Sequence, residues 1–460
     1  MQQPEHIIKN YHELLSHGQH RARSAALEIA EAAIRRAIPY SETLKLVQLC
    51  GDILFIGDRR IPLSEIDHIY VVGVGKGAYP IAAALEERLG ELIDEGIVLV
   101  KRGDTRRLQY IEIIESGHPL PDQAGIDGAR RILDVLCKAT ERDLIFAPIT
   151  GGSSAMLNLP FDGISLEDLR NINDLLLKSG ASIGKMNAVR KHLCHMKGGR
   201  FVEYAKPAEI HTLTLNTAPP DMPWPDLSLP DPTTFQDAID MLRQYGIWEE
   251  APQSVKEHLL SGLAHPQLET PKRLTHPRAF IHSVADPHSS CEAAAERARE
   301  LGYTPHILST AMEGDAANLG IFFAGLANEI SAANRPFAAP CALISAGETT
   351  VTIHGECGKG GPNQETALGF PLKLYAASQA VCLSMDSDGT DGPSDIAGGI
   401  SDALTCSRAH ELGLDLNAAL SRHDSSSALL QLGDALITGH TGTNLMNFRV
   451  VIVDQKEEET

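Results

Sequence analysis

The sequence predicts an α/β fold in two successive units, and two features of its 460 residues support this class. Short apolar runs of strand length alternate with amphipathic stretches of helix length, a pattern typical of parallel sheets covered by helices on both faces. The alternation occurs twice, once on each side of a polar, proline-containing passage at residues 265–277. We therefore expect a boundary in that passage, with domains at 1–265 and 278–460.

The first unit is predicted to begin with helices, because the first sixty residues have helical spacing with alanine-rich and arginine-rich stretches. Strands follow, with a helix at 79–89 after the first of them. The predicted strands are 69–72, 96–100, 110–114 and 143–148. Residues 216–233 are rich in proline and predict a long irregular loop, after which 234–245 and 251–263 have helical spacing.

The second unit repeats the alternation from Ala279 onward. Its predicted strands are 280–282, 305–308, 342–345, 380–384 and 449–453. We expect them to form the sheet of a second α/β unit.

Charge and composition exclude several classes of protein. The balance of 40 Lys+Arg against 60 Asp+Glu gives a formal charge of -20, so the net field repels nucleic acid and anionic membranes. Neither a leader-like N-terminus nor an apolar run of membrane-spanning length is present, so we predict a cytoplasmic protein. Eight cysteines without a CxxC pair predict buried free thiols.

A glycine-rich turn follows the first predicted strand and contains Gly73, Gly75, Lys76 and Gly77. Glycines let the backbone approach a ligand, and Lys76 adds a positive charge where a phosphate or carboxylate would bind. The spacing matches neither GxxxxGK[ST] nor GxGxxG. A tight turn carrying a surface lysine is the alternative.

A second turn of small residues follows the strand at 143–148 and contains Gly151, Gly152, Ser153 and Ser154. Backbone amides and serine hydroxyls in such a turn can bind an oxyanion. The alternative is a helix N-cap, and no G-x-S-x-G pattern indicates a nucleophilic serine.

Four cationic side chains lie between residues 190 and 200, namely Arg190, Lys191, Lys197 and Arg200. In so acidic a chain, this concentration of positive charge predicts a site for a di- or triphosphate. An exposed helix face could also produce it.

A carboxylate-rich loop at 386–395 follows a predicted strand of the second unit. Closely spaced aspartates in a glycine-rich loop suit Mg²⁺ with bound phosphate oxygens, so Asp388 and Asp391 are candidate metal ligands. Asx-turns and capping are the alternative. Further polar turns of this unit give the candidate binding residues Glu348, Thr349, Asn363, Thr441, Gly442, Thr443 and Asn444.

Six motifs, in order along nearly the whole chain, resemble those of the glycerate 2-kinase family. The C-terminal domain of that family is called MOFRL. Some of its members are named hydroxypyruvate reductase. The motifs lie at 72–77, 117–122, 187–193 with 197–200, 347–352, 389–393 and 441–444. The resemblance implies an N-terminal Rossmann-like parallel sheet, a C-terminal α/β domain and an active site in the cleft between them.

The same resemblance implies a kinase that uses ATP and Mg²⁺ to phosphorylate the 2-hydroxyl of D-glycerate, giving 2-phosphoglycerate. Lys76 matches the family's proposed catalytic lysine. Lys76 and Arg190 would hold the transferring phosphate, with Lys191 and Arg200 nearby. Phosphoryl transfer mostly needs positioning and charge neutralisation, which these residue types supply.

The chain departs from the family pattern at three positions. Asn216 stands where the family has an acidic residue, and an amide cannot act as a general base, so either the chemistry is compromised or Asp221 or Asp226 performs it. Pro362 replaces a cation of the family's Gly-Gly-Arg-Asn-Gln-Glu pattern, and Asn447 stands where an aspartate is usual.

Two other classes of function remain open. One is an NAD(P)H-dependent hydroxypyruvate reductase, against which the lack of GxGxxG counts. The other is a divergent relative that binds ligands without catalysis or has changed its substrate, which the segment at 216–229 supports. We predict a small hydroxy acid and a nucleotide as partners, neither nucleic acid nor membrane, and allow for a homodimer that no sequence feature decides.

Overall fold

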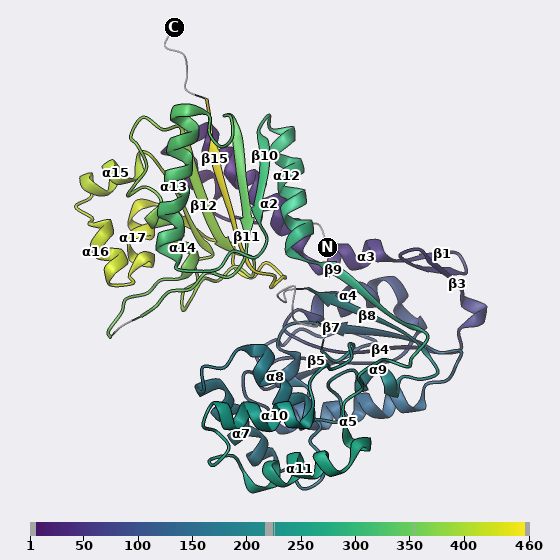
Figure 1. The fold of residues 1–460 in the computed structure, drawn as a ribbon. Coiled ribbons are helices and arrows are strands. Elements are labelled where there is room, and N and C mark those ends of the chain that lie inside the picture. The colour runs from purple at the N-terminus through teal and green to yellow at the C-terminus, as the bar shows by residue number, and fades with distance from the viewer. Residues whose placement is uncertain (1–5, 217–223, 225, 354, 456–460) are drawn as a thin grey trace. The chain divides into compact units, whose positions relative to one another are not determined.

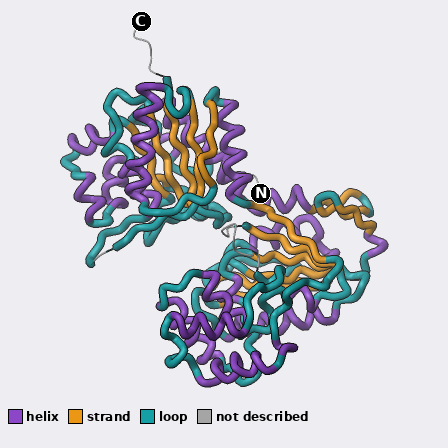
Figure 2. Tube along the Cα trace, viewed as in Figure 1, coloured by secondary structure: helices purple, strands orange, loops and turns teal. Residues whose placement is uncertain are grey.

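The computed structural model of the chain describes residues 6–216, 224, 226–353 and 355–455. The chain divides into two compact units, each with a six-stranded sheet and covering helices (Figures 1 and 2). The central unit is Pro39–Val284, and the terminal unit combines Met1–Ile38 with Ala285–Thr460. Among the described residues, no helix has the length and apolar character that crossing a membrane requires.

The sheet of the central unit confirms the predicted parallel arrangement. Its strand order is β6-β5-β4-β7-β8-β9, and the four pairings that join β6, β5, β4, β7 and β8 are all parallel. The strands are β4 (Ile69–Val74), β5 (Ile93–Lys101), β6 (Glu112–Ser116), β7 (Leu144–Ile149), β8 (Glu209–Leu215) and β9 (Ala279–Ala285). From β4 the chain first proceeds to one side, through β5 to β6, and then to the other, through β7 to β8. Ligands of open parallel sheets bind at such a reversal point, beyond the carboxyl ends of the two central strands.

Helices bury both faces of this sheet and build an additional layer. Apolar residues of α5 and α9 pack on alternate residues of the strands, such as Val72 and Leu99, while α4 contacts β5 and β7. Helices α7, α8, α10 and α11 enclose a separate core around Ile172 and Phe235. The helices are α3 (Pro39–Leu46), α4 (Ala78–Leu89), α5 (Gln123–Lys138), α6 (Ser153–Met156), α7 (Leu166–Lys178), α8 (Ile183–His192), α9 (Arg200–Tyr204), α10 (Phe235–Gln244) and α11 (Gln253–Ala264), with 3₁₀ turns at Leu63–Glu65, Gly90–Leu92 and Pro266–Leu268.

The terminal unit contains a mixed sheet in the order β10-β11-β15-β12-β13-β14. Strands β10 and β11 are parallel, whereas β15 is antiparallel to both β11 and β12. The strands are β10 (Thr304–Ser309), β11 (Cys341–Ala346), β12 (Ala380–Asp386), β13 (Gly398–Asp402), β14 (Ala435–Leu436) and β15 (Asn447–Val453).

Alternate residues of these strands face different helices, as the two-residue period of a strand requires. Ile344, Leu383 and Val450 belong to the core with α2 and α12, and Leu343 and Cys382 to the core with α13. The helices are α1 (Tyr11–Leu14), α2 (His20–Ala37), α12 (Pro287–Glu300), α13 (Ala316–Ala333), α14 (Pro362–Gly369), α15 (Thr405–Glu411), α16 (Leu416–Ser421) and α17 (Ser425–Leu432).

The prediction of helices throughout the first sixty residues is wrong from Val47 onward. Strands β1 (Val47–Cys50), β2 (Ile53–Ile56) and β3 (Arg59–Pro62) form a small antiparallel sheet. Two-residue loops join them, and the glycine of each loop, Gly51 or Gly57, has a positive φ. Such Gly-Asp loops are a hairpin signal that outweighs the helical spacing.

The compact units differ from the predicted domains, 1–265 and 278–460, at two places. Helix α2 packs on α12 and β15, so the N-terminal segment joins the terminal unit. Strand β9 is the edge strand of the central sheet, although its sequence was predicted to open the second series. Both differences arise because the chain crosses between the units twice. Of the irregular segment at 216–233, residues 216, 224 and 226–233 are described, whereas 217–223 and 225 lie outside the described residues.

Candidate functional site

The two predicted turns of the central unit meet at the carboxyl ends of its two middle strands. The amide of Lys76 donates a hydrogen bond to the carbonyl oxygen of Gly151 at 2.8 Å, and the amide of Gly77 donates to Thr150 Oγ1 at 2.9 Å. Thr150 in turn donates from its amide to the carbonyl of Val74 at 3.0 Å. The turn after β4 and the turn after β7 therefore form one continuous surface.

Glycine is required at two positions of this surface. Gly75 has φ +142°, and a Cβ there would lie 2.1 Å from Thr150 Oγ1. Gly152 has φ +88°, and its Cβ would lie 3.1 Å from Lys76 Cγ and 3.2 Å from His118 Cδ2. These contacts also place His118, which follows β6, beside Lys76. At Gly73, a Cβ would meet the carbonyl of Pro148 at 2.3 Å, so this glycine serves the packing of the strands.

The polar groups of this surface retain unused hydrogen-bonding capacity. The hydroxyls of Ser153 and Ser154 are buried and have no partner within the described residues. Lys76 is exposed, and the described part of the chain provides no hydrogen bond or ion pair to its ammonium group. Unpartnered buried hydroxyls are costly in a folded protein, so their presence here favours a ligand over a purely structural N-cap.

Two of the predicted cations belong to this same end of the sheet. Lys197 is buried, and its Nζ donates to the carbonyl oxygen of Ser154 at 2.6 Å and to Asn158 Oδ1 at 2.7 Å. Arg190, at the end of α8, donates from Nε to Asn173 Oδ1 at 2.8 Å. Burial lowers the pKa of each of these groups.

Electrostatics link these cations to His118. Burial lowers the pKa of the His118 imidazole, and the positive charges of Lys76, Lys101 and Arg190 lower it further. The imidazole is thus held neutral among cations that attract an anion. The sequence reasoning did not select His118 or Lys101 as site residues. The signal that identifies His118 is its place two residues after the end of β6, at the same edge of the sheet as the other turns.

The remaining two predicted cations have structural partners. Arg200 donates to the carbonyl oxygens of Lys191 at 3.1 Å, Cys194 at 3.3 Å and Leu268 at 2.6 Å. Lys191 Nζ lies 3.4 Å from Asp231 Oδ1. These contacts hold the segment after α8 in place, and a ligand-binding role for either cation stays a prediction.

Asn216 directly follows β8, and its side chain is exposed. It thus lies at the carboxyl edge of the sheet. Of the two aspartates that could replace a base at this position, Asp221 lies outside the described residues. Asp226 is buried.

The predicted residues of the terminal unit gather at one end of its own sheet. Asn363 Nδ2 donates to Asp391 Oδ1 at 3.0 Å and to Asn447 Oδ1 at 2.7 Å, and Ser384 Oγ donates to Asn363 Oδ1 at 2.7 Å. Thr349 Oγ1 accepts a hydrogen bond from Arg449 Nη2 at 2.6 Å, whereas Glu348 is exposed.

The turn at 441–444 closes over the carboxylate-rich loop. The amide of Thr441 donates to the carbonyl of Asp388 at 3.3 Å, and the Thr443 hydroxyl is buried without a partner in the described chain. Gly442 has φ +86°, and Asn444 is half-buried. Pro362 opens α14, where proline costs no helical hydrogen bond, so the loss of a cation here is compatible with the fold.

The Asp391 carboxylate accepts hydrogen bonds from the N-terminal end of α14. Its Oδ1 accepts from the amide of Asn363 at 3.2 Å, and its Oδ2 accepts from the amide of Gln364 at 2.9 Å and from Gln364 Nε2 at 3.1 Å. Asp388 accepts from the amide and hydroxyl of Thr390, both at 2.8 Å. Both contacts use the same oxygen of Asp388, Oδ1.

A preformed metal centre is absent from the described part of the chain, in which no three His, Cys, Asp or Glu side chains gather as ligands. Mg²⁺ commonly takes only one or two carboxylates together with substrate phosphates and water. The metal role of Asp388 and Asp391 therefore stays a prediction, and the hydrogen bonds favour Asp388.

Two further titratable groups of this cluster are Asp386, which opens the predicted carboxylate-rich loop, and Arg449, which the sequence did not single out. Burial, followed by the charge of Asp388, raises the pKa of Asp386 to about 8. Burial lowers the pKa of the Arg449 guanidinium to about 10, and its Nε has no partner in the described chain. Arg449 lies in an ordinary strand sequence, and only the pairing of β12 with β15 brings it close to Asp386.

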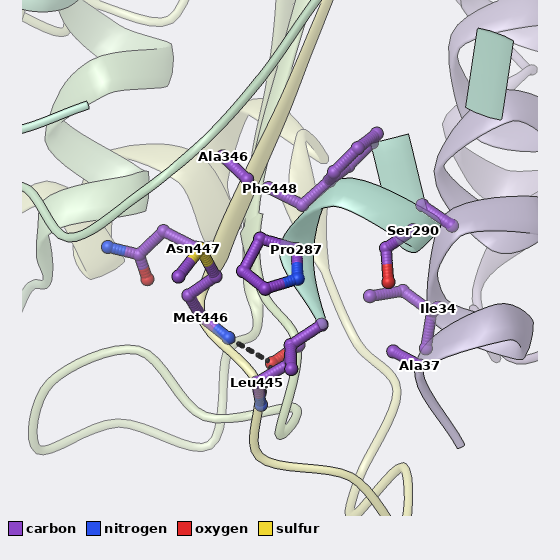
Figure 3. Close-up of a pocket in the computed structure, with 11 residues that line it drawn as sticks. Ile34, Ala37, Pro287, Ser290, Ala346, Leu445, Met446, Asn447 and Phe448 are labelled. Atoms are coloured by element: carbon purple, nitrogen blue, oxygen red, sulfur yellow. Dashed lines mark hydrogen bonds between the residues drawn. The ribbon is translucent and has the colours of Figure 1, made fainter. Parts of the chain in front are cut away.

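A small apolar cavity lies beneath this cluster, between α2, α12 and the start of β15 (Figure 3). Its walls include Ile34, Pro287, Ser290 and Phe448, and its volume of about 10 Å³ leaves room for one water molecule at most. Ser387 Oγ, which accepts from the amide of Met446 at 3.0 Å, fixes the loop above it. This cavity is a packing defect and has no room for a nucleotide or a sugar acid.

Two family models match successive parts of the chain. The MOFRL family matches residues 341–447, and a domain of unknown function (DUF4147) matches residues 25–260. A glycerate 2-kinase of Pyrococcus horikoshii is 40% identical over 441 residues, which cover 95% of this chain and 99% of that protein. A relative from Agrobacterium vitis, named provisionally as a hydroxypyruvate reductase, is 37% identical over 86% of this chain and 89% of its own length.

A solved structure supports the fold. The crystal structure of a glycerate kinase from Thermotoga maritima matches with a TM-score of 0.82 and 35% identity, covering 93% of this chain and 98% of that one. The identity to the Pyrococcus relative over nearly the full length of both chains, together with this shared fold, shows that the chain belongs to the glycerate 2-kinase family of enzymes.

Proposed function

We propose that the protein transfers the γ-phosphoryl group of ATP to the 2-hydroxyl of a small hydroxy acid, D-glycerate, and releases 2-phosphoglycerate. The observation that supports this most directly is the surface formed by the turns after β4 and β7. It combines an exposed lysine, two unpartnered serine hydroxyls and two buried cations at the reversal point of a parallel sheet. The names of the relatives point to the same reaction.

In this proposal, each group of the central unit has a defined task. Lys76 and the amides of Gly151 and Gly152 bind the anionic groups of the reactants, because a flexible ammonium and unhindered amides suit phosphate oxygens. Arg190 and Lys197 add positive charge from positions fixed by asparagine side chains, so little reorganisation is needed as charge develops. The hydroxyls of Ser153 and Ser154 orient the acceptor.

Mg²⁺ would supply charge neutralisation on the phosphates when bound. Asp388 of the terminal unit has the carboxylate best suited to hold it, since Asp391 is already used by α14. The residues at 441–444, Glu348 and Thr349 would then contact the nucleotide. That both units contribute to one site is a prediction from the family resemblance. A cytoplasmic location and a homodimer stay separate predictions.

The test is an assay of ADP formation with MgATP and a panel of sugar acids, with the product identified by phosphorus NMR. We expect D-glycerate to be the preferred acceptor and 2-phosphoglycerate to be the product. A parallel assay follows NAD(P)H oxidation with hydroxypyruvate. Oxidation of the dinucleotide without ADP formation would replace this proposal by the reductase function, and ligand-induced thermal stabilisation without any turnover would favour a binding protein.

A further inference from the structure

The segment around Asp226 is fixed to the C-terminal part of β8 from both sides. Trp224 Nε1 donates to Thr214 Oγ1 at 3.0 Å and to the carbonyl oxygen of Leu215 at 2.8 Å. Ser228 Oγ lies 2.7 Å from Thr212 Oγ1. Asp226 is therefore held near the carboxyl edge of the central sheet, where the turns after β4 and β7 also lie.

The same segment packs against the turn before α9. The amide of Gly199 donates to the carbonyl oxygen of Asp226 at 3.2 Å. A Cβ at Gly199 would lie 2.9 Å from the carbonyl oxygen of Leu229, and Gly199 has φ +86°. Glycine at this position thus allows the backbone of the Asp226 segment to lie directly on the turn that carries Lys197.

The carboxylate of Asp226 is buried and has no hydrogen-bond partner among the residues that the structure describes. Asp226 is 2% exposed, and within the described chain neither its Oδ1 nor its Oδ2 accepts a hydrogen bond. Asp231, five residues later and also buried, shows what a structural aspartate looks like here. It accepts from the amide and the hydroxyl of Thr233 and from the hydroxyl of Thr270. Burying a carboxylate without a partner is costly in a folded protein, so a purely structural role does not explain Asp226.

Asp226 lies among the cations that belong to the surface formed by the turns after β4 and β7. Burial raises the pKa of Asp226, whereas the positive charges of Lys197, Lys191 and Arg190 lower it and the charge of Asp231 raises it, with a net increase. Lys197 in turn contacts Ser154 of the turn after β7. Asp226 thus has a higher proton affinity than an ordinary aspartate and lies within the field of the cations assigned to the phosphate.

We propose that Asp226 is the general base of the phosphoryl transfer and replaces the acidic residue that the family has at the position of Asn216. The inference rests on the proposed kinase function and names the group that performs its proton transfer. The acceptor hydroxyl oxygen forms a bond to the γ-phosphorus of ATP while the bond from that phosphorus to the β,γ-bridging oxygen breaks. ADP leaves with that bond's electron pair, and the hydroxyl proton passes to a carboxylate oxygen of Asp226 and then to solvent.

The test compares Asp226→Asn with the wild type in steady-state kinetics on D-glycerate and MgATP across a pH series. Loss of a general base lowers kcat by about 10²- to 10⁴-fold. We expect that loss in kcat, a nearly unchanged KM, and disappearance of the acid limb of the pH profile. Melting temperature should not fall, because the variant removes an unpartnered buried charge. Asp174→Asn, on the exposed face of α7, is the matched control and should behave as wild type.

Two more variants make the result decisive. Asn216→Asp should not raise kcat above the wild-type value, since the base is already present. Asp226→Gly should be nearly inactive and should recover activity with added formate but not with chloride, a response that a structural role would not produce. Retained kcat and an unchanged pH profile in Asp226→Asn, or a folded Asp226→Gly that formate does not rescue, would overturn this inference alone. A wild-type protein without turnover on any acceptor would overturn the proposed function as well.

Discussion

The backbone amide of Lys76 donates a 2.8 Å hydrogen bond to the carbonyl oxygen of Gly151, which joins the turns that follow the two middle strands of the central sheet. The bond fixes the backbone of Lys76 and leaves its side chain exposed. The lysine is therefore positioned by its main chain and free to respond to a ligand with its ammonium group. A residue arranged in this way should affect binding and turnover without affecting stability.

Lys76→Met tests this expectation. A charge-assisted hydrogen bond to phosphate contributes about 1.5–3 kcal/mol, so kcat/KM for MgATP should fall by about ten- to a hundredfold. The melting temperature should stay at the wild-type value because the side chain packs against little. Lys178→Met, which changes another exposed lysine of the central unit, is the control. Unchanged kinetics in a folded Lys76→Met protein would remove the lysine from the site.

Alanine variants of Asp391 and Asp388 should differ, because Asp391 has a structural role and Asp388 is the candidate metal ligand. Asp391→Ala leaves the amides of Asn363 and Gln364 at the start of α14 without their acceptor and removes one of the two acceptors of Asn363 Nδ2, which should cost about 1–3 kcal/mol of stability. Asp388→Ala should cost less, since it removes only the contacts to Thr390, and should raise the Mg²⁺ concentration needed for turnover. Thermal melts and Mg²⁺ titrations of both variants measure these effects. Equal Mg²⁺ dependence in Asp388→Ala and wild type would contradict the metal role.

Local sequence was sufficient to predict the turns at 73–77 and 151–154. Strand-like runs end directly before them, and parallel strands bring their carboxyl ends to one edge. The carboxylate-rich loop at 386–395 was ambiguous for a physical reason. Aspartates that ligate a metal and aspartates that accept hydrogen bonds from helix amides occur in the same kind of glycine-rich loop, and only the contacts of Asp391 distinguish the two.

The burial and the electrostatic environment of Asp226 could not be predicted from the sequence. Its burial depends on Trp224 and Ser228 contacting β8, and its electrostatic environment depends on Lys197, which lies 29 positions earlier in the chain. No periodicity or motif encodes these tertiary contacts. The small sheet at β1 to β3 differs in kind, because its Gly-Asp hairpin loops are a local signal that the sequence does contain.

Acid stability should depend on Glu209. Burial raises the pKa of this carboxyl, but hydrogen bonds from His211, Arg59 and Arg278 outweigh it and lower the pKa to about 2. Because the folded pKa lies below the unfolded one, this stabilisation is complete above the unfolded pKa of about 4.5 and is lost as the pH falls toward 2. The shift corresponds to about 3 kcal/mol.

The measurement is the free energy of unfolding between pH 7 and pH 2.5, followed by circular dichroism. Glu209→Gln should be less stable than wild type at pH 7, and the two curves should converge as the pH falls through this window. A constant difference across the whole range would show that the carboxylate charge is not responsible.

The terminal unit should depend on the buried pair of Arg23 and Asp402. Arg23 Nε lies 2.5 Å from Asp402 Oδ2, Arg23 Nη1 lies 2.9 Å from Asp434 Oδ1, and all three side chains are fully buried. This cluster ties α2 near the N-terminus to β13 and to the residue before β14. Arg23→Met removes the shared cation and leaves two carboxylates buried, although Arg408 still pairs with Asp434 at 2.5 Å. Breaking a buried pair in this way costs about 3–5 kcal/mol.

We therefore expect a marked fall in the denaturant midpoint of Arg23→Met. Arg21→Met, which changes an exposed arginine of the same helix, should leave the midpoint near wild type. The double variant Arg23→Met with Asp402→Asn should recover part of the loss, because it removes one of the uncompensated charges. A midpoint that is equal in Arg23→Met and Arg21→Met would mean that α2 is held by its apolar face alone.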